Sequence, residues 1–362
     1  MYKILVIIQN KNNTIMRQYK EHGNVSLFDS EITLQKLSHL GNPLEKLSSV
    51  IDFEMFRERL ESKLLNNNKK NNSGAKPYDV VMMFKIIILQ KYYNISDEQT
   101  EYQINDRTSF KDFLGLSSGD KVPDSKTIWL FRERLTDNGL GEILFHDFVN
   151  TLTEKGLIFN EGQMIDASFV LAPKQHNTRE ENEKIKKGEG EELWNDKLQK
   201  KNHKDIDARW TQKGGQNYFG YKANAKVDKK SKFMKECITT PASVHDSQVL
   251  NNLLDESDRG QKIYADSAYV GQENTLQQYD LENQICKKGY RNKPLSEEAK
   301  ESNRQKSKIR ARVEHVFGFI EGAMHGFNVR CIGIKRATEA IFMTCFTYNL
   351  FRFEQISRLG IK

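Results

Sequence analysis

The chain has 362 residues, which is enough for two domains of ordinary size. Its 56 lysines and arginines outnumber its 49 acidic residues, and the net charge of +7 favours an anionic partner such as nucleic acid. Its four cysteines form no C-x-x-C pair and no apolar run reaches the ~18 residues of a membrane span, so the composition argues against zinc fingers, disulfide frameworks and membrane helices.

Residues 1–43 form an N-terminal extension for which the sequence predicts no defined structure, because its apolar residues follow neither a helix nor a strand period. The apolar run 4–8 is too short for a signal peptide and lacks a cleavage-site pattern. The sequence leaves open whether translation starts at Met1 or at Met16.

Residues 44–150 predict an all-helical domain that binds DNA. A polar, asparagine-rich loop at 66–72 precedes a helix at 80–89 that is apolar on nearly all sides, as expected for the central helix of a bundle. Ser96 opens the next helix with a capping-box pattern.

The helix that follows residues 123–125 carries two candidate DNA contacts, Arg132 and Arg134, which we expect to face outward. Ile128, Phe131 and Leu135 face inward at helical spacing. Short helices ending in one that bears arginines predict a helix-turn-helix-like module. A plain helical bundle with solvated charges is the alternative.

Residues 157–360 predict an α/β catalytic domain with a mixed sheet of the ribonuclease-H-like kind, because three strands in a row are followed by strands that alternate with helices. The strands are expected at 164–171, 218–227, 237–241, 262–265 and 284–288. Helices are expected at 245–254, 272–278, 303–324 and 336–359. A charged insertion at about 175–212 balances eight basic against eight acidic residues between 179 and 205, and we expect its Trp194 to pack back onto the body.

Three carboxylates predict a catalytic metal site. Asp166 and Asp266 each follow a short apolar run, which is typical of a strand that delivers an acid at its end, whereas Glu314 lies in a helical pattern rich in basic residues. The two aspartates are 100 residues apart, so they meet only if the strands 164–171 and 262–265 are neighbours. Hard oxygen ligands suit two Mg²⁺ or Mn²⁺ ions, with Asp166 bridging them and Asp266 and Glu314 each holding one.

The approach to Glu314 is strongly basic and predicts a path for a phosphate backbone. Between Cys286 and Arg312 there are ten basic residues against three acidic ones. The expected DNA contacts in this stretch are Lys287, Lys288, Lys306, Lys308, Arg310 and Arg312, and Lys293 lies among them. Arg310 stands one turn before Glu314, where it can orient that carboxylate or neutralise a phosphate; an ordinary helix-surface ion pair is the alternative.

Two weaker patterns complete the sequence. His245 and Asp246 open a helix, and the spacing of Ser243 and Asp246 indicates a helix cap rather than a catalytic part. The chain has no phosphate-binding loop of the G-K-[ST] kind, so no nucleotide cofactor is implied.

Several ordered motifs together resemble the DDE transposases of the insertion-sequence-five group over residues 44–355. They are the Asp166 strand, Asp207-Ala208-Arg209-Trp210, Tyr218-Phe219-Gly220-Tyr221-Lys222, Val244-His245-Asp246-Ser247, Tyr264-Ala265-Asp266-Ser267-Ala268-Tyr269, Arg312-Val313-Glu314-His315-Val316-Phe317-Gly318 and Tyr348-Asn349-Leu350. Ser307 and Glu321 stand where such transposases often carry a tyrosine and a lysine, so contacts with the element ends are expected from neighbours such as Lys306 and Lys308.

The resemblance implies an enzyme that cuts the ends of an insertion sequence and joins the 3′-hydroxyls to target DNA with two Mg²⁺ ions, Mn²⁺ being able to substitute. It implies the metal triad Asp166, Asp266 and Glu314, double-stranded DNA as partner, a homodimer or higher assembly on DNA, and action in the cytoplasm of a prokaryote, at the nucleoid when bound. Two other functions stay open: a nuclease of the same fold that does not join strands, and a catalytically silent DNA-binding regulator.

Overall fold

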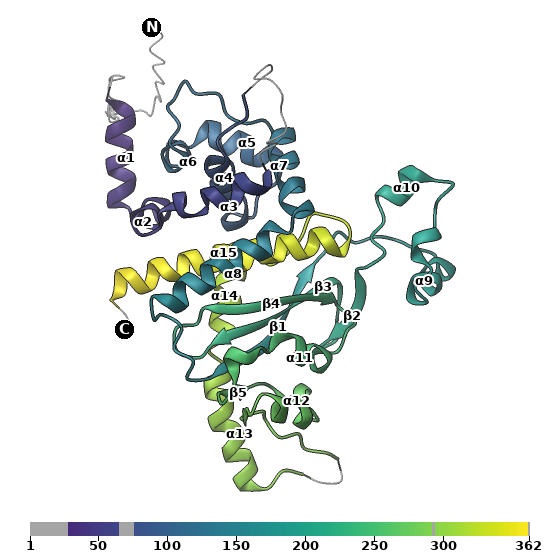
Figure 1. Ribbon diagram of the computed structural model, residues 1–362. Coiled ribbons are helices and arrows are strands. Elements are labelled where there is room, and N and C mark those ends of the chain that lie inside the picture. The colour runs from purple at the N-terminus through teal and green to yellow at the C-terminus, as the bar shows by residue number, and fades with distance from the viewer. Residues whose placement is uncertain (1–27, 65–75, 292–293, 361–362) are drawn as a thin grey trace, which may run out of the picture.

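The computed structural model describes residues 28–64, 76–291 and 294–360. The polar loop 66–72, Lys293 and both candidate start methionines lie outside these residues. Figure 1 shows a helical part above, two long helices across the middle, a sheet beneath them and an arm that extends to one side. None of the helices in the described ranges is long and apolar enough to cross a membrane.

The helical part begins earlier than the sequence predicted, because α1 (Asp29–His39) lies inside the segment 1–43 for which no structure was expected. Helix α1 buries no residue, so it lacks the apolar stripe on which a sequence prediction depends. The other elements of this part are α2 (Pro43–Val50), η1 (Phe53–Phe56), α3 (Arg57–Leu64), α4 (Val80–Tyr92), α5 (Asp97–Asp106), α6 (Thr108–Leu114) and α7 (Ser125–Asp137). Helix α4 is central, as predicted, with nine buried residues.

Side-chain caps mark where these helices begin. Asn42, Asp79, Ser96 and Asp124 each accept a hydrogen bond from a backbone N–H in the first turn of α2, α4, α5 and α7. The cap at Ser96 was predicted. Helices α6 and α7 are separated by ten residues, 115–124, so this pair lacks the tight turn expected of a helix-turn-helix.

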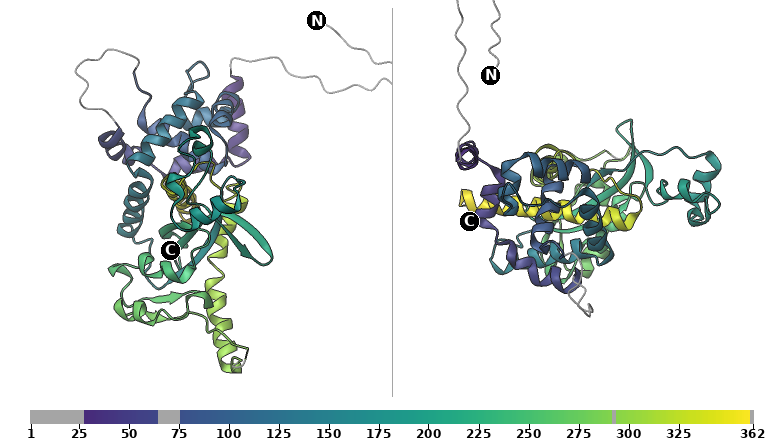
Figure 2. Two further views of the ribbon diagram at one scale, coloured as in Figure 1. Left: turned by 90° about the vertical axis from the view of Figure 1, so that its right-hand side faces the viewer. Right: turned by 90° about the horizontal axis from the view of Figure 1, so that it is seen from above.

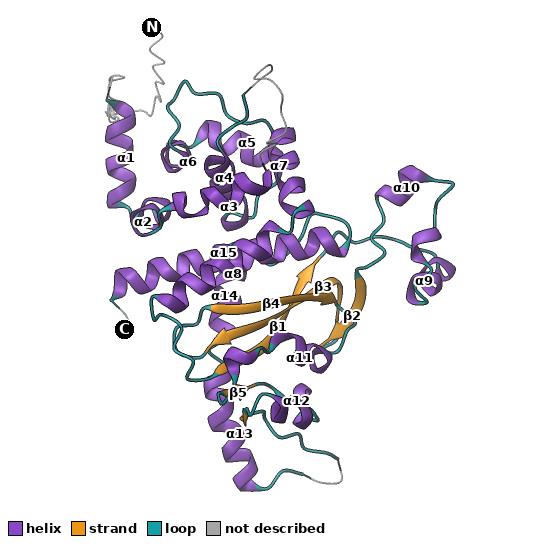
Figure 3. Cartoon of the chain, in the orientation of Figure 1, coloured by secondary structure: helices purple, strands orange, loops and turns teal. Residues whose placement is uncertain are grey.

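A six-stranded mixed sheet forms the second part (Figure 3). Its strands are β1 (Gln163–Leu171), β2 (Arg209–Lys213), β3 (Gln216–Asp228), β4 (Met234–Pro241), β5 (Lys262–Tyr264) and β6 (Glu282–Asn283). The order is β2-β3-β1-β5-β6, with β4 also paired to β3. Strands β1 to β4 pair antiparallel, whereas β5 runs parallel to both β1 and β6. The mixed sheet and the helical region before it are as predicted; β2 was missed, and β6 lies before the predicted 284–288.

Gly220 allows β3 to pair with two strands in succession. Its φ of +146° suits glycine, and an added Cβ would lie 2.2 Å from the carbonyl oxygen of Val170 on β1. Residues of β3 before this point pair with β2 and residues after it pair with β4. The glycine therefore lets three backbones approach one another closely.

The two faces of the sheet are covered by different helices. Met164 packs into the core that also contains Val316 and Phe317 of α14 (Glu314–Gly322), whereas Ile165 packs into a second core with Leu250 of α11 (Leu250–Leu253). This alternation follows from the two-residue period of a strand. Smaller elements on the second side are η3 (Asp246–Val249), η4 (Glu256–Asp258), η5 (Ser267–Tyr269) and α12 (Glu273–Gln278), so the single helix predicted at 245–254 is divided in two.

The helix predicted at 303–324 is also divided. Helix α13 (Glu297–Arg310) ends before Ala311, and α14 begins at Glu314. Between them the backbone N–H groups of residues 312–316 bond three residues back, the tighter pattern of a 3₁₀ turn. Glu314 therefore begins a helix instead of lying inside one, and the left view in Figure 2 shows α13 extending away from the sheet.

The charged insertion forms the arm, with α9 (Arg179–Lys186), η2 (Gly190–Glu192) and α10 (Leu198–Asn202). Trp194 is 7% exposed and donates a hydrogen bond to Glu181 at 2.7 Å, so it is buried within the arm itself and not, as the sequence predicted, against the body. At the base of the arm, the Gln175 side chain bonds both the N–H and the carbonyl of Asp205. The Asp205 carboxylate in turn accepts from Tyr221 on β3 and from the N–H of Gly333.

Helix α15 (Ile334–Leu359) joins the two parts. Together with α8 (Leu140–Glu154) it lies between the helical part and the sheet (Figure 1). The Asn349 side chain bonds both the N–H and the carbonyl of Met234 at the start of β4, and the Tyr348 hydroxyl donates to the carbonyl of Lys232. One hydrophobic core therefore runs from Leu44 through α15 to the sheet.

We expect Phe346→Ala to lower the free energy of unfolding by about 3–5 kcal/mol, because a buried aromatic ring would leave a cavity. Phe346 is 0% exposed, and its ring lies 5.4–5.6 Å from those of Phe56, Phe84 and Phe148. Urea unfolding followed by circular dichroism measures the change. Leu359→Ala, on the same helix but at a side chain 58% exposed, should have almost no effect. Two separate transitions, of which only one moves in Phe346→Ala, would contradict a shared core.

Candidate active site

Asp166 lies on β1, and Asp266 follows the end of the neighbouring strand β5 by two residues. In the parallel pair β1–β5, Gln163 lies opposite Ile263 and Met164 opposite Tyr264, an offset of 100 residues. The same offset carries on to Asp166 and Asp266, two residues beyond the last recorded pair. Neighbouring strands lie ~4.8 Å apart, so the two acids are brought to one place. The prediction that their strands are neighbours is confirmed.

Asp166 lies on the face of β1 that α14 covers, because it is two residues from Met164. One of its carboxylate oxygens accepts the N–H of Ala167 at 2.8 Å, and the other accepts from Arg310 at 2.7 Å. Burial raises the pKa of Asp166 above its usual value; the Ala167 N–H and Arg310 oppose the rise, and the negative charge of Asp266 adds to it. Asp266 ends its strand differently, since its carboxylate caps η5 by accepting the N–H of Ala268 at 2.8 Å.

Arg310 connects Glu314 with the aspartates, because its guanidinium contacts both Glu314 and Asp166. The Arg310 guanidinium lies 2.7 Å from an Asp166 oxygen and 3.8 Å from a Glu314 oxygen, so it stands between the two acids. Its side chain and that of Asp166 are 22% and 21% exposed, whereas the Glu314 side chain is 65% exposed. Arg310 therefore contacts the strand aspartate more closely than the glutamate beside which the sequence placed it.

The aspartate pair fits a divalent cation. Both are hard oxygen ligands, and Arg310 is the single cation that forms an ion pair with either of them in the described part of the chain. Across the ranges 28–64, 76–291 and 294–360, no three histidine, cysteine, aspartate or glutamate side chains surround a common point as metal ligands. Arg310, at 2.7 Å from Asp166 and 3.8 Å from Glu314, lies between these two acids.

A second group of polar residues adjoins the aspartates and was not identified as a site from the sequence. Lys222 lies opposite Phe169 in the β1–β3 pair and donates to Asp246 and to the carbonyl of Val244, both at 2.7 Å. The Tyr269 hydroxyl is buried without a hydrogen-bond partner among the described residues, and burial together with Asp246, Asp166 and Asp266 raises the pKa of Tyr269. The motifs that contain these residues were visible, but only the strand register brings them together.

The cap expected from Ser243 and Asp246 is wrong. His245 caps η3 instead, by accepting the N–H of Ser247 at 3.3 Å. Asp246 is thereby free to pair with Lys222.

The basic residues predicted to contact DNA are not equally available. Lys287, Lys288, Lys308 and Arg312 have exposed side chains. Lys306 donates to the carbonyl of Ile285 at 3.2 Å, and Arg310 is held by Asp166.

In the helical part, Arg134 is exposed, but the expectation that Arg132 faces outward is wrong. The Arg132 guanidinium binds both carboxylate oxygens of Asp97, at 2.5 and 2.9 Å, and also donates to Gln90. Its side chain is 26% exposed and that of Asp97 is 15% exposed, so this pair holds α7 against α5.

Comparison with known proteins agrees with this geometry. Residues 159–350 match the family described as Transposase DDE domain, a stretch that contains the whole sheet and the three acids. Residues 32–134, in the helical part, match the family described as Transposase domain (DUF772). No solved structure matches the chain. Since the first match alone spans more than half of its length, the chain belongs to the DDE transposases.

Proposed function

We propose that this transposase cuts the ends of an insertion sequence and joins the freed 3′-hydroxyls to target DNA, as a member of the insertion-sequence-five group. The observation that carries the proposal is the parallel pairing of β1 with β5, which brings Asp166 on β1 and Asp266, two residues beyond the end of β5, to one place beside Glu314. The substrate is double-stranded DNA in the bacterial cytoplasm. Because an element has two ends, the active form is a homodimer or a higher assembly on DNA.

Asp166, Asp266 and Glu314 would hold the two Mg²⁺ or Mn²⁺ ions. Such ions polarise the phosphodiester and activate the attacking water or hydroxyl oxygen. Glu314, whose side chain is exposed, would join the aspartates when Arg310 leaves Asp166.

Arg310 would couple DNA binding to the formation of the metal site by Asp166, Asp266 and Glu314. Its guanidinium now neutralises part of the charge of Asp166. A DNA phosphate offers the same guanidinium a stronger anionic partner, because arginine binds phosphate through two parallel hydrogen bonds. Lys287, Lys288, Lys308 and Arg312 would hold the flanking backbone, whereas the charge of Lys222 is balanced by Asp246.

Replacing Asp166, Asp266 or Glu314 by alanine should lower the rate of end cleavage by roughly 1,000-fold or more, because each loss removes several kcal/mol of metal-dependent stabilisation of the transition state. The measurement is Mg²⁺-dependent nicking of DNA that carries an element end. Glu321→Ala is the matched control, since Glu321 is an exposed glutamate on the same helix. An Asp266→Ala protein that cuts at the wild-type rate would refute the assignment. Joining of cut ends to a target plasmid separates a transposase from a nuclease of the same fold.

Arg310→Ala should bind Mn²⁺ about tenfold more tightly than the wild type when no DNA is present, because the competing guanidinium charge beside Asp166 is gone. The same variant should cleave more slowly even at saturating DNA. Mn²⁺ affinity is measured by electron paramagnetic resonance and turnover by single-turnover cleavage. Arg312→Ala, whose side chain is exposed two residues away, should leave the Mn²⁺ affinity unchanged. Equal Mn²⁺ affinities in the two variants would show that Arg310 does not guard the site.

Lys308→Ala should reduce the slope of log DNA affinity against log salt concentration by about one unit, since each phosphate contact releases counterions. Binding to an element end is measured between low and moderate salt. Lys155→Ala, at an exposed lysine just beyond α8, should keep the full slope. If both variants keep it, the backbone does not run along α13.

A further inference from the structure

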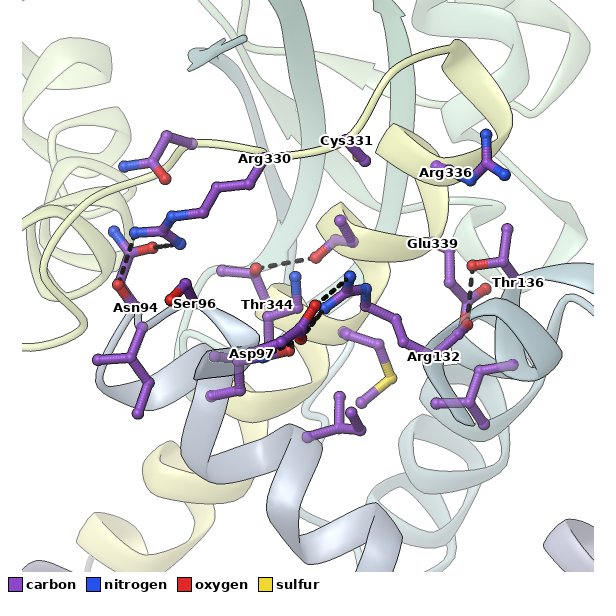
Figure 4. A pocket seen from close by; sticks show the side chains of 18 of the residues that line it. Asn94, Ser96, Asp97, Arg132, Thr136, Arg330, Cys331, Arg336, Glu339 and Thr344 are labelled. Atoms are coloured by element: carbon purple, nitrogen blue, oxygen red, sulfur yellow. Dashed lines mark hydrogen bonds and ion pairs between the residues drawn. The ribbon is translucent and has the colours of Figure 1, made fainter. Parts of the chain in front are cut away.

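A cavity of about 270 Å³ lies between the helical part and the segment 326–344, away from the acids. Helices α4, α5 and α7 line one side, and residues of α15 and of the loop before it line the other (Figure 4). None of Asp166, Asp266 and Glu314 belongs to its walls. The cavity is therefore a separate feature of the molecule.

Two ion pairs in its walls are internally balanced. Arg132 is bound by Asp97, and Arg336 by Glu133 at 2.7 Å. These four side chains fix the walls and leave no net charge for a ligand.

Lys91 on α4 is the cation that remains. It has no hydrogen-bond or ion-pair partner anywhere in the part of the chain that the structure describes. Burial, together with the nearby positive charge of Arg132, lowers the pKa of Lys91 to about 8. A half-buried ammonium group without a partner is costly, and an anion in the cavity would compensate that cost.

Glu339 on α15, the most deeply buried acid of the cavity, does not serve as that partner. Its side chain accepts the N–H of Gly141 at 2.7 Å, and a Cβ on Gly141 would lie 2.6 Å from the same carboxylate oxygen. Burial raises the pKa of Glu339 to about 7, so this group carries only part of a negative charge at neutral pH. The remaining acid of the lining, Glu98, is exposed.

Arg330 supplies a second uncancelled charge at the mouth of the cavity. Its guanidinium donates to the side-chain oxygen and to the backbone carbonyl of Asn94, both at 2.7 Å. Both acceptors are neutral, so they hold the guanidinium in place without neutralising it. Figure 4 shows Arg330 and Asn94 joined at one side of the cavity, away from the Asp97–Arg132 pair.

We propose that this cavity binds a phosphate group, which the Lys91 ammonium contacts from within and the Arg330 guanidinium from the mouth. The phosphate comes either from the DNA backbone or from a free phosphorylated compound. The first source rests on the proposed function, whereas the second is independent of it.

Titration calorimetry of the full-length protein with pyrophosphate tests the phosphate site without any DNA cleavage. The phosphate site and the proposed transposase function can therefore be refuted independently of each other. Lys91→Gln should weaken pyrophosphate binding about tenfold or more, the usual cost of one hydrogen bond to a charged group. Lys85→Gln is the matched control on the same helix, because the Lys85 ammonium lies over the Phe53 and Phe113 rings and outside the cavity. If Lys91→Gln fails to fold, Arg330→Gln replaces it, because its side chain is exposed; this variant should also weaken pyrophosphate binding.

Sulfate distinguishes the role of Lys91 by pH, since sulfate keeps its charge between pH 6 and 10. The charged groups that face Lys91 are Arg132 from α7, Arg330 and Cys331 from the loop, and Glu339 from α15. Lysine is cationic below its pKa, so sulfate affinity should fall as the pH rises through about 8 in the wild type. In Lys91→Gln only the fall from ionisation of Glu339 should remain, and it should lie above pH 7, because the charge of Lys91 lowers the pKa of Glu339 in the wild type.

The salt dependence of binding to a DNA duplex identifies the source of the phosphate. A slope reduced by about one unit in Lys91→Gln, but not in Lys85→Gln, assigns the site to the DNA backbone. Weakened pyrophosphate binding with an unchanged slope assigns it to a free phosphorylated compound. If Lys91→Gln and Lys85→Gln agree in pyrophosphate affinity and in DNA salt slope, the proposal is overturned.

Discussion

Helix α15 is enclosed by other elements, because residues 339–351 are buried without a break. A helix buried on all sides needs neighbours on all sides, and here α4 and α8 cover it from the helical part and β4 from the sheet. Asn349 and Tyr348 then fix the start of β4 and the turn before it. Strand β4 pairs with β3, and β3 with β1, so the position of Asp166 depends through two strand pairings on how α15 is buried.

The acidic site combines two opposing electrostatic demands. Register brings Asp166 and Asp266 to neighbouring positions, and the burial that comes with it disfavours ionisation of Asp166. Arg310 partly neutralises this charge, at the end of a helix whose last turn it shares with Lys308. A site that carried both aspartates with no cation nearby would be costly to fold, and Arg310, which also lies 3.8 Å from Glu314, supplies that cation.

The sequence predicted the fold where patterns are strong. The strands that carry Asp166 and Asp266, the central helix α4 and the final helix all follow from apolar runs of the right length. Strand β2 was missed because its residues are mostly exposed and lack the alternation of a half-buried strand. The break before Glu314 was missed because residues 309–320 keep a helical apolar period across it, and a 3₁₀ turn changes that period too little to be seen.

The site was predictable only in its residue types. Spacing indicated that Arg310 and Glu314 are neighbours, but the closer partner, Asp166, lies 144 residues away in the chain. Arg132 was placed outward because it is charged, whereas Asp97, which draws it inward, belongs to another helix. The Lys222–Asp246 pair likewise depends on a strand register that no local pattern contains. Long-range ion pairs of this kind are set by tertiary structure, which overrides local propensity.

Hydrogen bonds at the base of the arm fix its two ends to each other and to the start of α15. Gln175 and Asp205 hydrogen-bond each other where the polypeptide enters and leaves the arm. The carboxylates of Asp205 and Asp207 also accept hydrogen bonds from the backbone N–H groups of Gly333 and Ile334, respectively, at the start of α15. Beyond this clasp the arm is stabilised by contacts of its own, such as those of Trp194 and Lys200 with Glu181. Arg209 on β2 donates to the carbonyl of Ile185, so the sheet contacts the arm at α9. We therefore expect residues to be gained or lost between 187 and 199 without moving β1 or β2, so that the arm can diverge in length while the catalytic sheet stays the same.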